Sequence, residues 1–414
     1  MNILLVHQNF PGQFKHLAPA LRARGDKVVV MCMNAFAGGD GMGGTPIVRT
    51  KLGKGNTPGI HPWMVDFESK FMRGEATYHN AVKLRDSGFT PDVIVAHPGW
   101  GEALFLKDVW PKARLGLYLE YYYGSRGGDS EFDPEFPAPA GDDDNSRLRM
   151  KNAGNWMMLG ELDAGLSPTT WQASTFPAAF RERISVIHDG IDTVRVAPNA
   201  QAALTLPDGT VCRAGEPTIT FVNRNLEPYR GYHVFMRALP ALQAACPHAR
   251  VVIVGAEGVS YGAKPPQGKT WKQIFLAEVQ DQLDMSRVHF VGQLPYGQFL
   301  TLLQVAAVHV YLTYPFVLSW SLLEAMSAGC AIVGSSTAPL LEAIRHGDTG
   351  RLVGFFDGAG LVAQVADLLA NPAERARLGA HARAFAQSHY DLRSVCLPRQ
   401  IAWVDQLGSS RTLT

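Results

Sequence analysis

The chain is poor in cysteine and lacks any close cysteine–histidine cluster. Its five cysteines are scattered over 414 residues without a CxxC pair. This spacing argues against a zinc site and against a disulfide scaffold, and it fits a reducing compartment. The chain also lacks an uninterrupted stretch of about 18 apolar residues, so we expect no segment that spans a bilayer.

An excess of charge of one sign is absent too. Lys and Arg number 38 against 37 Asp and Glu, which leaves a formal net charge of +1. This balance does not suggest a polyanion-binding protein, so we expect no nucleic acid partner, although a local basic patch is not excluded. The first apolar run lacks a basic flank and is too short for a signal peptide, so we expect a cytoplasmic protein.

The chain does contain a repeated strand–turn–helix unit. The apolar run 3–6 is followed by a glycine turn and then by apolar residues at i, i+3, i+4 and i+7 from Phe14. That spacing predicts an amphipathic helix, and the apolar run 28–30 predicts the next strand. The same order returns from Ile219 onward. Units of this kind join parallel strands, so the sequence predicts an α/β protein of two doubly wound halves, each roughly 200 residues long.

The expected domains are an N-terminal Rossmann-like half over residues 1–195 and a C-terminal one over residues 196–391. Ligands of open α/β sheets bind beyond the carboxyl ends of the strands, so two such edges facing one another would form an interdomain cleft. The chemistry is therefore expected in the loops that follow strands. The stretch 126–144 is interpreted as a structureless, solvated insertion, with a mobile lid or acceptor loop as the alternative.

The most informative loop follows the strand that begins at Ile219. It presents Arg224 and Arg230 at the start of a helix, where unpaired backbone N–H groups and the helix dipole favour an anion. Arginine is always charged and binds phosphate oxygens through a bidentate fork. Two arginines suit a departing diphosphate, whose charge grows as a glycosidic bond breaks. The alternative is a pair of surface arginines in ion pairs with Glu227 and its neighbours.

A second loop between a strand and a helix covers residues 314–321. Glu324 lies one turn into the helix and can accept hydrogen bonds from two adjacent hydroxyls, as on a ribose. The alternative is a capping-box glutamate that answers Ser321, which we place near the cap position. The last residues of the loop can direct N–H groups at a phosphate: Leu318, Ser319, Trp320 and Ser321.

Four positions in the N-terminal half also follow predicted strands. Gly12 lets the backbone approach a ligand closely, although its loop is not a GxGxxG. His97 stands among glycines at a strand's carboxyl end, which suits hydrogen bonding to a ligand; a structural histidine is the alternative. Glu120 and Tyr121 are acceptor-side candidates because they suit contact with a sugar, and core packing explains them equally well.

Together these segments resemble family 4 of the retaining glycosyltransferases, which have the GT-B fold. Residues 186–192 resemble the family's V-I-P-N-G-V-D join, and residues 322–330 resemble its L-L-E-A-M-A-x-G signature. Arg224 with Arg230 and Gly231 resembles the R…K-G pair, with arginine in place of lysine and one extra residue of spacing. Residues 341–353 resemble the closing E-x-I…G-x-x-G-x-L-V segment. The resemblance covers nearly the whole chain and is strongest from residue 186 onward.

The resemblance implies a nucleotide diphosphate sugar as co-substrate, with no further cofactor. Arg224 and Arg230 would hold its diphosphate, and Glu324 its ribose. The departing phosphate would take the acceptor's proton on the same face, so that the anomeric configuration is retained and electrostatic stabilisation carries much of the rate. No metal would be needed, because the arginines and the helix dipole neutralise the diphosphate. The remaining roles are a diphosphate-facing loop at Gly12, a base-bordering loop at Leu294 and a contact of His97 with the donor sugar or reaction centre.

One position departs from the family pattern. Phe316 stands where the family has a glutamate that contacts the transferred sugar. An apolar ring cannot accept those hydrogen bonds, so the donor sugar differs, the neighbouring backbone substitutes, or activity is lost. The tail 392–414 resembles the helix that crosses back to the N-terminal domain in this fold.

The preferred interpretation is a cytoplasmic glycosyltransferase that builds a cell-surface polysaccharide or glycoconjugate on a glycan, lipid-linked or protein acceptor. A GT-B nucleotide-sugar epimerase, a phosphorylase, or a catalytically silent GT-B binding module are the alternatives. Peripheral contact with the inner face of a membrane stays open, because the stretch 51–83 contains several Lys and Arg.

Overall fold

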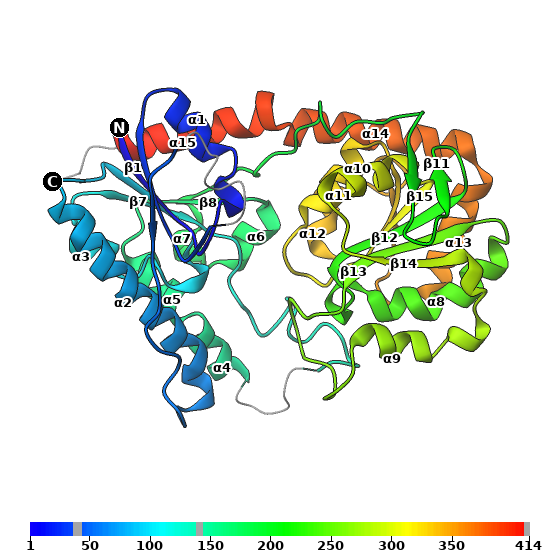
Figure 1. Cartoon of the computed structure of the whole chain (residues 1–414), viewed down its shortest axis with the longest axis horizontal. Coiled ribbons are helices and arrows are strands. Elements are labelled where there is room, and N and C mark those ends of the chain that lie inside the picture. Colours follow the sequence, from blue (N-terminus) through cyan, green and yellow to red (C-terminus); the bar gives the residue numbers. More distant parts are fainter. Residues whose placement is uncertain (36–43, 138–143, 410–414) are drawn as a thin grey trace. The chain divides into compact units, whose positions relative to one another are not determined.

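The computed structural model describes residues 1–35, 44–137 and 144–409. Contacts divide the chain into two compact units (Figure 1). Unit 1 comprises Met1–Arg126, Ala138–Gly190 and Arg393–Thr414, and unit 2 comprises Gly127–Pro137 and Ile191–Leu392. Each unit is built around one large sheet in which all neighbouring strands are parallel, with helices along both faces. This confirms the predicted α/β class with two Rossmann-like halves.

The sheet of unit 1 has the strand order β5-β3-β1-β6-β7-β8-β9. Its central strands β1 and β6 are apolar apart from Asn2 at the start of β1, because helices cover both faces of the sheet. On β1, Leu4 and Val6 belong to one core cluster, whereas Ile3 and Leu5 belong to another on the opposite face. The strands are β1 (Asn2–Val6), β3 (Lys27–Cys32), β5 (Ile47–Arg49), β6 (Val93–Ala96), β7 (Arg114–Tyr118), β8 (Ala164–Ser167) and β9 (Ile184–Val186).

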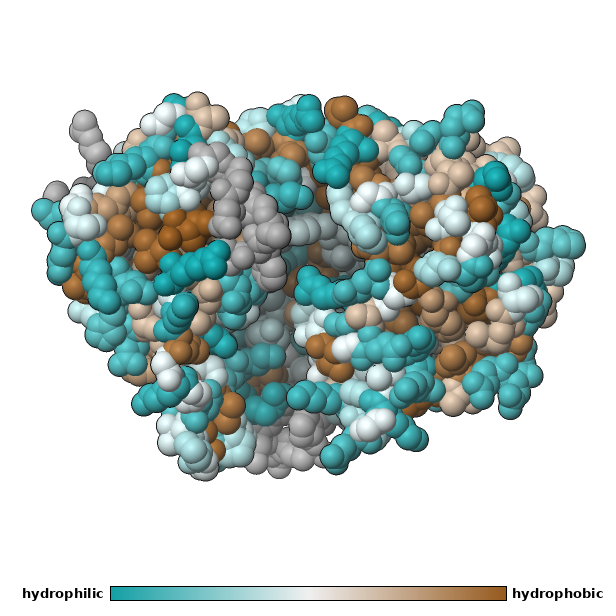
Figure 2. All heavy atoms as spheres, in the orientation of Figure 1, coloured by the Kyte–Doolittle hydropathy of each residue, from teal (hydrophilic) through white to brown (hydrophobic). Residues whose placement is uncertain are grey.

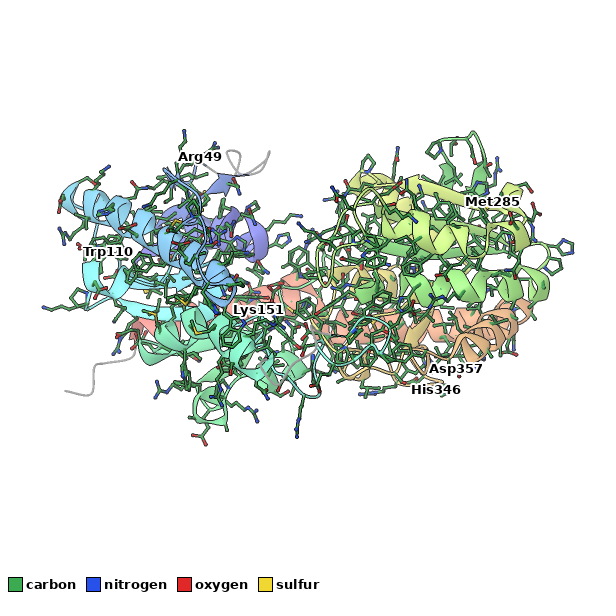
Figure 3. The ribbon with its side chains drawn as sticks, turned by 90° about the horizontal axis from the view of Figure 1, so that it is seen from below. Arg49, Trp110, Lys151, Met285, His346 and Asp357 are labelled. Carbon is green, nitrogen blue, oxygen red and sulfur yellow. The ribbon has the colours of Figure 1, made fainter. Side chains whose placement is uncertain are left out.

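Apart from α2 (Val65–Asp86) and the last helix, α15 (Leu397–Ser409), the helices of unit 1 are short. The long helix α2 packs against α3 (Leu106–Val109) and α5 (Ala153–Gly160). The other elements are η1 (Gly12–Phe14), α1 (Leu17–Ala23), η2 (Pro62–Met64), η3 (Pro98–Trp100), α4 (Asp144–Lys151), α6 (Thr170–Thr175), α7 (Ala178–Arg181) and a small parallel pair, β2 (Asn9–Phe10) with β4 (Asn34–Ala35). Trp110, labelled in Figure 3, is 3% exposed and completes the core on the α2 face.

The last helix of the chain packs into unit 1. A π-helical turn, η7 (Leu392–Cys396), leads into α15 (Leu397–Ser409), whose Trp403 and Leu407 are buried against the sheet. A Cβ atom on Gly116 of β7 would lie 2.5 Å from the Trp403 ring and 2.6 Å from Leu407. Gly116 therefore leaves the space that these two side chains fill.

The sheet of unit 2 has the strand order β14-β13-β12-β15-β16-β17. The strands are β12 (Thr218–Asn225), β13 (Arg250–Ala256), β14 (Val288–Gly292), β15 (Val308–Tyr311), β16 (Ala331–Ser335) and β17 (Arg351–Val353). Ile219 and Phe221 of β12 face the largest core cluster, where Phe221 stacks on Phe235 with ring centroids 4.4 Å apart. A hairpin of β10 (Ala203–Thr205) and β11 (Val211–Arg213) lies outside this sheet.

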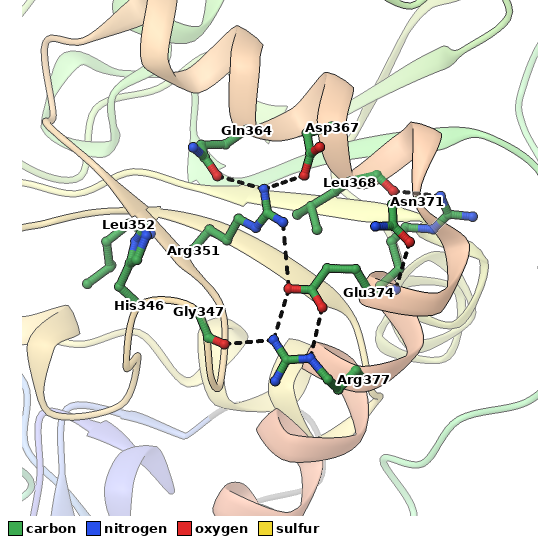
Figure 4. A network of polar contacts seen from close by, with 11 residues as sticks. His346, Gly347, Arg351, Leu352, Gln364, Asp367, Leu368, Asn371, Glu374 and Arg377 are labelled. Atoms are coloured by element: carbon green, nitrogen blue, oxygen red, sulfur yellow. Dashed lines mark hydrogen bonds and ion pairs between the residues drawn. The ribbon is translucent and has the colours of Figure 1, made fainter.

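The helices of unit 2 run from η4 to α14. They are η4 (Pro228–Arg230), α8 (Tyr232–Ala245), α9 (Trp271–Ala277), η5 (Gln280–Gln282), η6 (Met285–Arg287), α10 (Tyr296–Val305), α11 (Trp320–Ser327), α12 (Ala338–Leu341), α13 (Gly358–Ala370) and α14 (Pro372–Tyr390). Charged contacts join β17, α13 and α14 (Figure 4). Arg351 contacts Asp367 at 2.6 Å and Glu374 at 3.6 Å, and Glu374 contacts Arg377 at 2.8 Å.

The segment Gly127–Pro137 comes from the first half of the sequence but packs within unit 2. Asp129 and Asp133 are only 7% and 2% exposed, and both accept hydrogen bonds from unit 2. The prediction of a solvated, structureless insertion is wrong for this part, because hydrogen bonds to residues distant in sequence order it. Residues 138–143 of the predicted loop lie outside the described residues.

Two observations concern the surface. Hydrophilic and hydrophobic residues are interspersed over the face seen in Figure 2. In the part of the chain that the structure describes, no helix combines the length and the hydropathy needed to cross a membrane.

Candidate functional site

Arg230 is buried at the carboxyl end of the unit 2 sheet. It ends η4, and Gly231 follows with φ +69°. A Cβ atom on Gly231 would lie 2.4 Å from Leu312 Cβ, so glycine at this position allows η4 to pack against the end of β15. The residue Arg230 as a whole is 8% exposed. Its guanidinium donates from Nη1 to Thr313 Oγ1 at 2.7 Å and to the Val317 carbonyl at 3.3 Å. These acceptors are neutral, so they orient the guanidinium without cancelling its charge.

Arg224 lies on β12 and is exposed. Within the described residues, no carboxylate oxygen lies within 4.0 Å of either guanidinium. Glu227, the expected ion-pair partner, is 1% exposed and instead accepts the backbone N–H groups of Ser260 and Tyr261, each at 3.0 Å. The ion-paired alternative for the two arginines is therefore wrong.

The two guanidinium charges act on one neighbour. Burial raises the pKa of the Glu227 carboxyl, and the charges of Arg230 and Arg224 both oppose that rise. Two positive charges thus lie near the same buried carboxylate, at the end of the same strand. This arrangement can attract an anion with more than one negative group.

The loop before α11 differs from the prediction in its cap. Ser319, not Ser321, is the N-cap residue, and its side chain accepts the Ser321 N–H at 3.3 Å. The N3 position is consequently Leu322, so Glu324 cannot complete a capping box. Its carboxylate instead accepts the Tyr296 hydroxyl at 2.6 Å. The Ser319 N–H donates to the Tyr311 hydroxyl at 3.2 Å and is therefore engaged within the protein.

The other predicted donor-side residues have different surroundings. Phe316 is 4% exposed, and its ring lies edge-on to Tyr229 at 5.5 Å and to Tyr261 at 4.9 Å. Leu318 is buried in a core cluster beside α11, so its side chain is unavailable to a ligand. Trp320 is 42% exposed, and Leu294 is half-buried against an apolar cluster beside the hairpin.

A second polar cluster lies at the carboxyl ends of β1, β6 and β7 in unit 1. His97 Nε2 lies 3.4 Å from Glu120 Oε2, and its Nδ1 accepts the Gly99 N–H at 3.1 Å. Because Nδ1 is the acceptor, the ring proton of neutral His97 sits on Nε2 and points to the carboxylate. By the same reasoning His7, whose Nδ1 accepts the Asn9 N–H at 3.0 Å, carries its proton on Nε2.

Gln13 joins His7 to the same carboxylate. His7 Nε2 lies 2.6 Å from Gln13 Oε1, and Gln13 Nε2 donates to Glu120 Oε1 at 3.1 Å. Burial and the charge of His97 lower the pKa of His7 to about 3, so this ring is neutral at pH 7. For Glu120, burial acts to raise the pKa, but the interactions of its carboxylate with His97, His7 and Gln13 together outweigh burial and lower the pKa. Glu120 is therefore an ionised acceptor with a side chain that is 35% exposed.

The contacts of this cluster explain why residue 12 is a glycine. Its φ is +45°, and a Cβ atom would lie 2.2 Å from His7 Cε1. The His7 ring therefore occupies the place of a side chain at residue 12, and the approach of a ligand to the Gly12 backbone stays a prediction. Tyr121 is 8% exposed with its ring edge-on to Tyr123 at 5.3 Å, as core packing requires. Tyr123 in turn lies under the ammonium group of Lys151, which is 3.4 Å from the centroid of its ring.

Sequence reasoning missed several members of the unit 1 cluster. His7 directly follows an apolar run, just as His97 does, and this shared position was a usable signal. Trp100 stacks on His97 at 4.4 Å, and the Tyr118 hydroxyl donates to Asp189 at 2.8 Å. Gln13 carried no signal in the sequence. Among the described residues, no three His, Cys, Asp or Glu side chains gather as metal ligands would.

Comparisons with known proteins match both halves of the chain to glycosyltransferase families. The Glycosyl transferase family 4 group matches residues 24–196, and the Glycosyl transferases group 1 family matches residues 209–385. A D-inositol 3-phosphate glycosyltransferase of Nocardia farcinica is 27% identical over 249 residues, which are 58% of this chain and 53% of the relative. A glycogen synthase of Mycobacterium tuberculosis is 30% identical over 212 residues, which are 51% of this chain and 46% of the relative. The chain thus spans about half the length of the curated relatives it matches.

Solved structures share the fold over almost the whole chain. Sucrose-phosphate synthase from Thermosynechococcus elongatus has a TM-score of 0.71 at 17% identity, covering 99% of this chain and 100% of that one. Anabaena Alr3699/HepE in complex with UDP has a TM-score of 0.67 at 15% identity, covering 98% and 100%.

The two Rossmann-like units and these structural neighbours define an α/β protein of the GT-B architecture. Within that class, the matches to both halves place the chain among the family 4 glycosyltransferases. The predicted family and the predicted enzyme class are both confirmed.

Proposed function

We propose that the protein is a retaining, metal-independent glycosyltransferase that moves a sugar from a nucleotide diphosphate donor to a glycan, lipid-linked or protein acceptor. One observation carries the proposal: the Arg230 guanidinium is buried, and no carboxylate in the described residues lies within 4.0 Å of it. A buried guanidinium that forms no direct ion pair gains little to offset its desolvation, whereas a bound diphosphate supplies the opposite charge and accepts bidentate hydrogen bonds.

The printed names of neighbouring structures support the donor class. Anabaena Alr3699/HepE was solved with UDP-glucose, and an E. coli trehalose-6-phosphate protein was solved with UDP-2-fluoro glucose. Relatives named for inositol phosphate and for glycogen favour a carbohydrate or glycoconjugate acceptor. We therefore propose cell-surface polysaccharide or glycoconjugate synthesis in the cytoplasm, either free or at the inner face of the membrane, as the setting.

The proposed chemistry relies on fixed charges. Thr313 and Val317 hold Arg230 in place before a donor arrives, so little reorganisation is needed as the diphosphate departs. Arg224, exposed on β12, adds a second positive charge, and Glu324 receives the ribose hydroxyls beside Tyr296. In unit 1, the ionised Glu120 accepts a hydroxyl hydrogen bond from a sugar, and His97 orients that carboxylate.

Nucleoside diphosphate binding tests the proposal directly. We expect Arg230→Ala to weaken binding by about 2–3 kcal/mol, the usual worth of a charge-assisted contact, and to abolish transfer. Arg250→Ala is the matched control, because it also removes one arginine of unit 2, but one at the amino end of β13 that pairs with Glu216. Calorimetric titration with a panel of nucleoside diphosphates measures both. Equal affinities for Arg230→Ala and Arg250→Ala would contradict the assignment.

The titration, together with product analysis of the donor incubated alone, separates the alternatives. A silent binding module that has lost its donor site would bind none of the nucleoside diphosphates. An epimerase would release altered sugar and free nucleotide from the donor alone, without an acceptor in the reaction.

A further inference from the structure

The segment Gly127–Pro137, which we call the acidic segment, packs within unit 2 and contacts α8 through His233 and Arg237. It carries four carboxylates in eleven residues: Asp129, Glu131, Asp133 and Glu135. Three of them contact Tyr229, His233 and Arg237, which recur at intervals of four residues through η4 and α8. The segment is therefore held in one register along the helix.

Polar and aromatic contacts hold the C-terminal part of the acidic segment against the rest of unit 2. Asp133 lies 3.0 Å from His233 Nε2, and Glu135 binds the Arg237 guanidinium in a bidentate pair at 2.6 and 2.7 Å. Phe136 packs edge-on against Trp271 of α9 at 5.2 Å, and Phe132 lies 5.1 Å from both Tyr314 and Phe355. These contacts hold the C-terminal part of the acidic segment in place and so limit where Asp129, in its N-terminal part, can lie.

Asp129 meets unit 2 next to the proposed diphosphate site. It is 7% exposed and accepts the hydroxyl of Tyr229, the residue immediately before Arg230. The Tyr229 ring is 5.5 Å from Phe316, and Phe316 is 4.9 Å from Tyr261. The Arg230 guanidinium in turn lies 5.5 Å from the centre of the Tyr261 ring. An aromatic group of Tyr229, Tyr261 and Phe316 thus connects Arg230 to a buried carboxylate.

This surrounding suits one kind of sugar. Tyr261 of this aromatic group lies beside the Arg230 guanidinium that would hold the diphosphate, and aromatic faces and edges can pack against the C–H groups of a pyranose. A carboxylate accepts two hydroxyl hydrogen bonds and repels a second carboxylate. Asp129 accepts the Tyr229 hydroxyl of this aromatic group, and a second buried carboxylate, Glu227, accepts the backbone N–H of Tyr261.

We propose that Asp129, presented by the acidic segment, is a specificity-determining residue that selects a neutral sugar with adjacent hydroxyls and rejects donors that carry a uronic acid. The proposal rests on the proposed function, since it assumes that the diphosphate binds at Arg230. It assigns to the acidic segment a part in donor choice that is independent of nucleotide binding.

The test compares Asp129→Asn with Glu135→Gln. Asparagine keeps an oxygen for the Tyr229 hydroxyl but loses the charge, whereas Glu135→Gln loosens the same segment at its exposed end and leaves Asp129 intact. Steady-state transfer is measured with paired donors of one nucleotide, the hexose and its uronic acid form. Calorimetry with the free nucleoside diphosphate and thermal unfolding accompany each variant.

For Asp129→Asn we expect kcat/KM with the hexose donor to fall about ten- to a hundredfold, as for one lost charged hydrogen bond. The preference for hexose over uronic acid should shrink by at least as much, while the affinity for the nucleoside diphosphate stays within about twofold. Unchanged donor preference in Asp129→Asn would overturn the inference, as would an equal change in Glu135→Gln. Failure of the wild-type protein to bind any nucleoside diphosphate would instead overturn the proposed function.

Discussion

Replacing Gly12 by alanine should damage the unit 1 cluster through two separable effects. The first is conformational, because Gly12 has φ +45°, where an L-residue costs about 1–2 kcal/mol. The second is steric, because the new Cβ would lie 2.2 Å from His7 Cε1 and 2.4 Å from His7 Nε2. Displacing a buried ring in this way costs a further 1–3 kcal/mol, roughly, so the expected total is about 2–5 kcal/mol.

Gly59→Ala provides the matched control. Gly59 also lies in unit 1 with positive φ, +76°, but a Cβ atom there would meet nothing within 4 Å. Its cost should therefore be the conformational part alone, about 1–2 kcal/mol. The difference between the two variants isolates the contact with His7.

Urea unfolding midpoints measure these losses of stability for the whole protein, and native-state hydrogen exchange of the β1 amides measures them locally. In a His7→Ala background, Gly12→Ala should lose its steric cost and resemble Gly59→Ala. Equal destabilisation by Gly12→Ala in both backgrounds would refute the reasoning, because the His7 ring would then have no part in requiring glycine.

Two further predictions concern pH and metal. Burial raises the pKa of Glu102 to about 7, and neither of its carboxylate oxygens has a hydrogen-bond partner among the described residues. The folded chain therefore holds a proton that the unfolded chain releases near its ordinary value of 4.5, so stability falls as pH rises from 4.5 through 7. Glu102→Gln should remove this loss, and the urea midpoints of both proteins at pH 5 and pH 8 check it; parallel losses in the two proteins would count against it. EDTA should leave sugar transfer intact, because guanidinium groups are proposed to neutralise the diphosphate. A clear loss of rate that Mg²⁺ restores would contradict that mechanism.

Local patterns in the sequence were enough to predict the architecture of two α/β halves. Apolar runs followed by 3.6-residue spacing predicted the alternation of strands and helices, and strand ends led to Arg224, Arg230, His97 and Glu120. These residues do lie at the carboxyl edges of the two sheets. The position of a residue after a strand is a local property, so the sequence contains it.

Contacts between distant residues were not predictable in this way. Asp129 and Tyr229 are 100 residues apart, and Asp133 and Tyr314 are 181 apart. The polar face of α8, with His233 and Arg237, has the composition of a solvated face, but the acidic segment covers it. The cap at Ser319 was missed for a different reason: Ser321 is an equally good cap in isolation, and the backbone conformation of Ser319 decides between them.

The interleaving of the two units has a consequence for how the protein is made and dissected. Most of unit 1 leaves the ribosome first, yet one face of its sheet is covered only in part, by residues such as Leu17 and Leu21, until residues 397–409 supply Trp403 and Leu407. Unit 2, conversely, includes residues 127–137, which pack within it but are synthesised well before the rest of it. A cut of the gene at the apparent midpoint would therefore give two fragments, each missing a piece of its own interior.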